Sequence, residues 1–168
     1  MKRIYTVILL LSAGTLLAAC SEADSVSEAV RSNGELDTLE EALVITGLED
    51  TLEDENTSYT LFAPNEDAFE NFLAGSGVDD ISEVDTDALL GVLEYHIVLS
   101  EYDETELEER SGTTLSTMRG DELSIRTVDG DVFINSAEIL DPGLLDADND
   151  TENGVVHKVD RVLTPPGF

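Results

Sequence analysis

The spacing of apolar residues changes along this chain, and the change limits the folds that are open to it. Between residues 37 and 97, apolar side chains recur every three or four positions, as at Leu89, Leu93 and Ile97, which predicts helices with one buried face. From Thr113 on, apolar and polar residues alternate, which predicts strands. Helices followed by strands in one chain indicate an α+β fold.

Local signals predict where the helices begin and end. Asp37 is expected to cap the first helix, with Glu40 completing a capping box and Gly47 ending the helix. Asn65 is expected to cap a second helix. A third helix is predicted to start at residue 85 or 86 and to bury an apolar stripe that reaches Ile97.

Turn signals separate the predicted strands. Residues 59–62 are expected to form a strand that stops at Ala63-Pro64. Asp129-Gly130 lies between two alternating runs, which predicts a β-hairpin. A final strand is expected over residues 154–163.

The first 20 residues have the pattern of an export signal. Lys2 and Arg3 precede an apolar run over residues 4–17, which is too short to span a bilayer and is typical of a signal peptide. Residues 17–20, Leu-Ala-Ala-Cys, resemble the bacterial lipoprotein box, which predicts a signal over residues 1–19 and a lipid on Cys20. The alternative is an ordinary secretory signal with a chance cysteine.

The export pattern also predicts location and domain order. A lipid on Cys20 would make the membrane a partner, and Ser21 after it favours the outer membrane, on its periplasmic or surface face. Residues 20–34 are expected to be a lipidated tether with a helical turn near Val26 to Val30, and residues 35–168 are expected to form one domain. Cys20 is the only cysteine, so the chain has no intramolecular disulfide.

The charge of the chain excludes some partners. It carries 38 acidic and eight basic residues, a net charge of −30, which makes nucleic acids and anionic lipid headgroups poor ligands. Cations or basic surfaces are better ones. The acids are scattered among apolar residues rather than gathered in a tail, and we interpret them as a halophilic adaptation in which salt screens their repulsion.

Three segments together resemble the fasciclin (FAS1) domain family. Residues 59–69 resemble its first conserved block, Tyr95-His96 match its central Tyr-His motif, and residues 153–166 resemble its second block. The likeness implies an α+β, FAS1-type wedge or sandwich of short β-strands packed with several α-helices. It also implies adhesion to proteins, matrix or surface glycans, and no catalytic residue or cofactor that is general to the family.

The resemblance and the residue pattern nominate Tyr95, His96 and His157 as ligand-binding residues. In animal members of the family, integrin binding has been attributed to the Tyr-His region and to an Asp-Ile pair, where this chain has Asp141-Pro142, so the second feature does not carry over. Both histidines fall on apolar faces, so buried structural histidines are the favoured interpretation. A zinc site is not indicated, because no third ligand accompanies them.

An acidic loop predicts a second, different kind of site. The carboxylates of Asp146, Asp148, Asp150 and Glu152 alternate along the chain, as in the start of a calcium-binding loop. The loop lacks a glycine at its sixth position and a bidentate glutamate at its twelfth, so a chance cluster in an acidic chain is the alternative.

These observations predict a binding module rather than an enzyme. The chain has no Gly-x-Ser-x-Gly, no His-Glu-x-x-His and no glycine-rich phosphate loop. We expect a secreted, lipid-anchored, monomeric adhesion module that binds an extracellular or envelope protein or glycan. The alternatives are an envelope structural protein without an outside ligand, and a lipoprotein that binds calcium or a small ligand.

Overall fold

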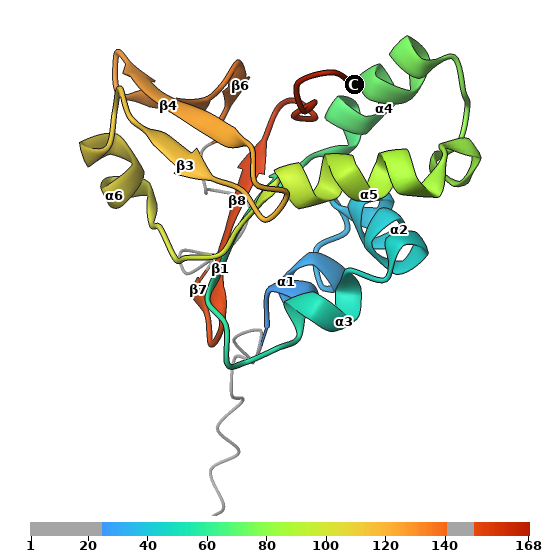
Figure 1. Ribbon diagram of the computed structural model, residues 1–168, viewed down its shortest axis with the longest axis horizontal. Helices are drawn as coiled ribbons and strands as arrows, with labels where there is room; N and C mark the ends of the chain where they lie inside the picture. The colour runs from blue at the N-terminus through green and yellow to red at the C-terminus, as the bar shows by residue number, and fades with distance from the viewer. Residues whose placement is uncertain (1–24, 141–149) are drawn as a thin grey trace, which may run out of the picture.

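The computed structural model describes residues 25–140 and 150–168, and it has the expected α+β fold (Figure 1). The helices are α1 (Val26–Arg31), α2 (Asp37–Thr46), α3 (Glu49–Leu52), α4 (Glu66–Ser76), the 3-10 helix η1 (Ile81–Glu83), α5 (Thr86–Tyr95) and α6 (Glu104–Glu109). The strands are β1 (Tyr59–Pro64), β2 (Ile97–Val98), β3 (Thr114–Ser116), β4 (Glu122–Val128), β5 (Asp131–Ile134), β6 (Ala137–Glu138), β7 (Asp150–Thr151) and β8 (Gly154–Val159). Within these described ranges, no helix combines the length and apolar character needed to cross a membrane.

The described strands form two four-stranded sheets. The first has the order β2-β1-β8-β7, and its central strands β1 and β8 are parallel, with Tyr59 opposite Gly154 and Pro64 opposite Val159. The second is an antiparallel meander in the order β3-β4-β5-β6. The second sheet and α6 lie on one side of the β1–β8 pair, and α1 to α5 lie on the other (Figure 1).

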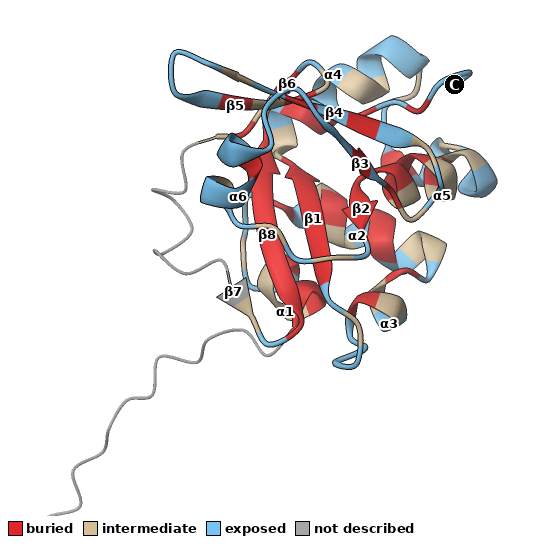
Figure 2. Cartoon of the chain, turned by 60° about the vertical axis from the view of Figure 1, so that its left-hand side comes forward, coloured by how far each residue is buried: buried red, intermediate tan, exposed pale blue. Residues whose placement is uncertain are grey.

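The β1–β8 pair separates two hydrophobic cores. Every residue of both strands is buried, as Figure 2 shows. Leu61 and Val156 pack with the helices, whereas Phe62 and Val159 pack with the second sheet. Strands that are covered on both faces are usually apolar, and β1 is mostly so, whereas β8 also buries His157 and Lys158, whose Nζ pairs with Glu35.

The hairpin and two of the helix starts are confirmed. Asp129 and Gly130 have φ values of 57° and 106° and join β4 to β5, as a tight turn with two positive φ angles requires. The Asn65 side chain accepts a hydrogen bond from Ala68 N, and the Asp85 side chain caps α5 in the same way.

The predicted capping box at the start of α2 is wrong. Asp37 is the first residue of the helix, and the capping position is held by Leu36, which is fully buried and has no side-chain oxygen. Glu66 of α4 supplies the missing acceptor, because its carboxylate accepts hydrogen bonds from Thr38 N and Thr38 Oγ1. A tertiary contact therefore replaces the local cap.

Three predicted boundaries also shift. β1 continues through Pro64, because a proline at the end of a strand loses no essential donor and Asn65 N bonds to Val159 O instead. α5 ends at Tyr95, so Ile97 belongs to β2 rather than to the helical stripe. The final strand, predicted to reach residue 163, ends at Val159.

The first segment of the described chain belongs to the domain core. Val26 and Val30 of α1 are buried against the helices, and Val26 N donates to Asn153 Oδ1 over 2.8 Å. Residues 25–34, which were expected to belong to the tether, thus pack against the domain, and α1 lies where a helical turn was expected. The predicted signal peptide and Cys20 lie outside the described residues.

Candidate functional site

The Tyr95 side chain joins three elements inside the domain. Tyr95 is 3% exposed, and its hydroxyl donates to Glu122 O over 3.1 Å and accepts from Asn135 Nδ2 over 3.0 Å. These bonds tie the end of α5 to β4 and to the turn after β5. The Tyr95 hydroxyl therefore both donates and accepts a hydrogen bond within the protein.

His96 is fully buried and holds the C-terminal segment in place. Leu163 N donates to His96 Nε2 over 2.8 Å, so the imidazole proton resides on Nδ1, which donates to Val92 O over 2.8 Å. The backbone oxygen of His96 also accepts from Phe62 N over 3.0 Å. A neutral histidine thus connects α5, β1 and the segment after β8.

His157 is also an interior residue. It lies on β8 with 6% exposure, its Nε2 is 2.7 Å from Tyr102 O, and its ring stacks on Phe62 with centroids 5.8 Å apart. Tyr95, His96 and His157 are therefore not brought together at a surface. Their burial favours the structural interpretation, in which the Tyr-His motif organises the fold.

The burial of His96 predicts a loss of stability in acid. Burial lowers the pKa of His96 from 6.5 to about 4, although its bond to Val92 O opposes the shift. Between those pH values the unfolded chain binds a proton that the folded domain does not. His96 therefore makes its full contribution to stability above about pH 6.5. About 3 kcal/mol of that contribution is lost as the pH falls to about 4.

This prediction can be checked by following the Cε1–H resonance of His96 by NMR and by urea unfolding across the same pH range. We expect the resonance to stay at its neutral position down to about pH 5. Titration of His96 near its ordinary pKa would contradict the assignment of a desolvated, neutral imidazole.

The predicted calcium site stays a prediction. Asp146 and Asp148 lie outside the described residues, as does the side chain of Asp150. In the part of the chain that is described, no group of three or more His, Cys, Asp and Glu side chains could hold a metal ion, and Glu152 belongs to no such group.

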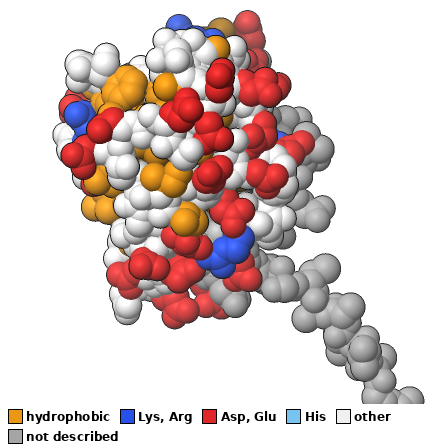
Figure 3. All heavy atoms as spheres, turned by 90° about the vertical axis from the view of Figure 1, so that its right-hand side faces the viewer, with side chains coloured by type: hydrophobic (Ala, Val, Ile, Leu, Met, Phe, Trp, Pro, Cys, Tyr) orange, Lys and Arg blue, Asp and Glu red, His pale blue; other side chains and the backbone are white. Residues whose placement is uncertain are grey.

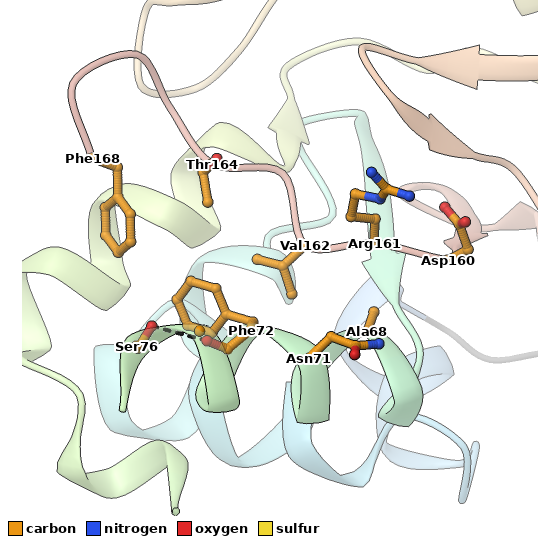
Figure 4. Close-up of a pocket in the computed structure, with 10 residues that line it drawn as sticks. Ala68, Asn71, Phe72, Ser76, Asp160, Arg161, Val162, Thr164 and Phe168 are labelled. Atoms are coloured by element: carbon orange, nitrogen blue, oxygen red, sulfur yellow. Dashed lines mark hydrogen bonds between the residues drawn. The ribbon is translucent and has the colours of Figure 1, made fainter. Parts of the chain in front are cut away.

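An open groove lies between α4 and the C-terminal segment 160–168 (Figure 4). Its volume is about 670 Å³, and ten residues line it. Val162 points toward α4 at its floor, while the rings of Phe72 and Phe168 face each other with centroids 5.9 Å apart. Sequence reasoning did not place α4 beside this segment, of which residues 160–163 were expected to continue the final strand.

The Tyr-His motif positions one wall of the groove. The bond from Leu163 N to His96 Nε2 fixes the C-terminal segment just beyond β8, and Val162 and Leu163 are 7% and 3% exposed. The other wall is α4, whose start is set by the Asn65 cap. Hydrogen bonds therefore anchor both walls of the groove, although the walls are far apart in the sequence.

Acidic side chains are spread over the face formed by the helices (Figure 3). Lys and Arg are rare there, and apolar side chains emerge between the acids. Val44 and Phe168 are among the large apolar residues that are more than half exposed, at 55% and 56%. Such a surface attracts cations and basic proteins over long distances only at low ionic strength.

Comparison with known proteins identifies the class. A profile of the fasciclin domain matches residues 34–165, and the chain therefore belongs to the fasciclin domain family. Protein sll1483 of Synechocystis sp. is 34% identical over 108 residues, which cover 64% of this chain and 56% of that protein. A fasciclin-like arabinogalactan protein of Arthroderma benhamiae is 28% identical over 168 residues, which cover 90% of this chain and 38% of that protein.

Human periostin is similar over a smaller share of its length. It is 27% identical over 107 residues, which cover 64% of this chain and 12% of periostin. The chain thus spans from 12% to 56% of the length of these relatives.

A solved structure shares the fold. The FAS1 domain pair from the insect cell adhesion molecule Fasciclin I aligns with a TM-score of 0.67, over 84% of this chain and 51% of that one. The sequences are only 16% identical over this alignment, so the match concerns the fold alone. It agrees with the wedge of strands and helices implied by the sequence motifs.

Proposed function

We propose that this protein is an exported, lipid-anchored, monomeric module of the cell envelope that binds an external protein or glycan and serves in adhesion. The observation that carries the proposal is the open groove beside the C-terminal segment, whose lining offers both aromatic rings and polar groups to a ligand. Membership of the fasciclin family supports it, and so does the fold shared with an insect cell adhesion molecule.

The contacts of His96 and His157 also favour a binding function over catalysis. His96 bonds to the backbone through both ring nitrogens, and His157 bonds to Tyr102 O and stacks on Phe62. A general base has to reach the proton of a substrate, and His96 is 0% exposed.

Replacing Cys20 with serine is expected to release the protein from membranes. Acyl chains on the cysteine would each contribute about 0.8 kcal/mol per buried methylene, and serine cannot carry them in the same way. Fractionation of cells that express the wild-type and Cys20→Ser chains measures this directly. A Cys20→Ser protein that still sediments with the membranes would show that another feature anchors it.

Surface display can be tested on intact cells. Protease added outside is expected to remove the wild-type protein, because an adhesion module must reach partners beyond the envelope. Cells that have been opened serve as the control for cleavability. Complete protection on intact cells, with cleavage after opening, would favour an envelope structural role instead.

A further inference from the structure

The side of α4 that lines the groove is uncharged. The stripe runs from Ala68 to Ser76 at three- and four-residue spacing, which places its members on one side of the helix. The acids of α4, Glu66, Asp67 and Glu70, do not line it. Although the chain has 38 acids among 168 residues, this stripe carries no carboxylate, and its members Asn71, Gly75 and Ser76 are exposed.

The groove has an apolar end and a polar end, and the side chains that line it carry one negative and one positive charge. Phe72 and Phe168 form the apolar end, with their rings inclined at 32°. Asp160 and Arg161 lie at the other end and carry opposite charges (Figure 4). Asp160 is held by its side chain, which accepts from Glu138 N over 2.8 Å.

Uncharged polar groups complete the lining. The Ser76 hydroxyl donates to Phe72 O and can only accept from a ligand, whereas the Asn71 amide, which donates to Asp67 O, and the Thr164 hydroxyl provide both donors and acceptors. Sugar hydroxyls also donate and accept, and the C–H face of a pyranose ring packs on aromatic rings in the way that other apolar groups do. The volume of about 670 Å³ is within the usual range for a small-ligand site.

We propose that this groove binds a short, uncharged oligosaccharide segment of a cell-surface glycan. The inference rests on the proposed function as a binding module and names its ligand class and its surface. An anionic glycan is disfavoured because the chain carries a net charge of −30. A peptide that binds by adding a strand would need an open strand edge, whereas a helix and an irregular segment form these walls.

Titration with defined sugars tests the ligand class. Residues 21–168 contain both cores and every described element, and calorimetry with uncharged tetrasaccharides of glucose, galactose and mannose would be run at low and high NaCl. We expect saturable binding of at least one, with a dissociation constant that is the same at about 0.05 M and 1 M salt. Binding of none, tighter binding of oligogalacturonate, or tenfold weakening by salt would overturn the proposal.

Two neighbouring positions on α4 provide a matched pair of variants. A Cβ at Gly75 would meet no atom within 4 Å, so Gly75→Leu fits the helix while its side chain enters the groove. Ala74→Leu adds the same side chain at an exposed position outside the lining. We expect Gly75→Leu and Phe168→Ala to weaken sugar binding about tenfold or more, and Ala74→Leu to leave it unchanged.

The same variants separate this inference from the function on which it rests. If wild-type and Gly75→Leu proteins retain cell-envelope fragments equally well, the groove is not the binding site. That result would leave the adhesion function standing. If wild-type protein binds the tetrasaccharides but no envelope material, the adhesion function is refuted. That result would leave the groove as a sugar-binding site.

Discussion

Replacing Gly154 with alanine is expected to prevent the domain from folding. Gly154 begins β8 directly beside Tyr59 of β1, and an added Cβ would lie 2.1 Å from Tyr59 O and 2.8 Å from Tyr59 C. Those atoms belong to the backbone of the central strand pair, so they cannot move away without parting β1 from β8, against which both cores pack. The φ of +156° at Gly154 is also one that other residues rarely adopt.

We expect the Gly154→Ala substitution to cost more than about 4 kcal/mol, which is a large share of the stability of a small domain. Circular dichroism and urea unfolding of residues 21–168 measure the effect. Gly75→Ala is the matched control, because its Cβ enters open space and the helix gains up to about 1 kcal/mol. A Gly154→Ala protein with an unchanged unfolding midpoint would contradict the close approach of β8 to β1.

Replacing Asn153 with alanine is expected to cause the second largest loss. Asn153 is 2% exposed, and its side chain joins α1 to the loop after α3. Its Oδ1 accepts from Val26 N over 2.8 Å, and its Nδ2 donates to Leu52 O over 2.8 Å. Alanine would leave both of these backbone groups buried without partners, at a cost of about 3 kcal/mol in total.

Thermal unfolding gives the size of the Asn153 effect. We expect the melting temperature of Asn153→Ala to fall by about 10 °C. Asn71→Ala is a suitable control, because Asn71 is exposed and donates only to Asp67 O of its own helix, so its change should stay within about 0.5 kcal/mol. Equal melting temperatures for the two variants would show that the contacts of Asn153 contribute little.

Features with a local cause could be predicted from the sequence. The caps at Asn65 and Asp85 and the turn at Asp129-Gly130 depend on a few neighbouring residues, and all three occur in the structure. The family motifs were identified by resemblance, and the two conserved blocks contain the paired strands β1 and β8. Gly154, within the second block, is required by the backbone of Tyr59.

Features with a distant cause could not be predicted. Asp37 does not cap α2, because the buried side chain of Leu36 takes that place and Glu66 comes from another helix. α6 was missed because its sequence is mostly acidic and buries only Leu107, with Asp103 as the cap. A short helix with one apolar anchor has no periodicity to detect.

The candidate site likewise combines features that could be predicted from the sequence with features that could not. Tyr95 and His96 stood out in the sequence, but their burial depends on Glu122, Asn135 and Leu163, which contact them from later parts of the chain. The groove combines α4 with residues more than 80 positions further along, so no local pattern marks it. The bond from Leu163 N to His96 Nε2 links the motif to the groove.

The most direct test of the central claim is retention of labelled cell-envelope fragments by immobilised residues 21–168. We expect saturable retention by the wild-type domain and none by the unfolded Gly154→Ala chain, because binding requires the assembled groove. Retention should also survive Tyr95→Phe, since that hydroxyl is buried and bonded within the protein. A folded wild-type domain that retains nothing at low or high salt would contradict the account and assign the protein a structural role in the envelope.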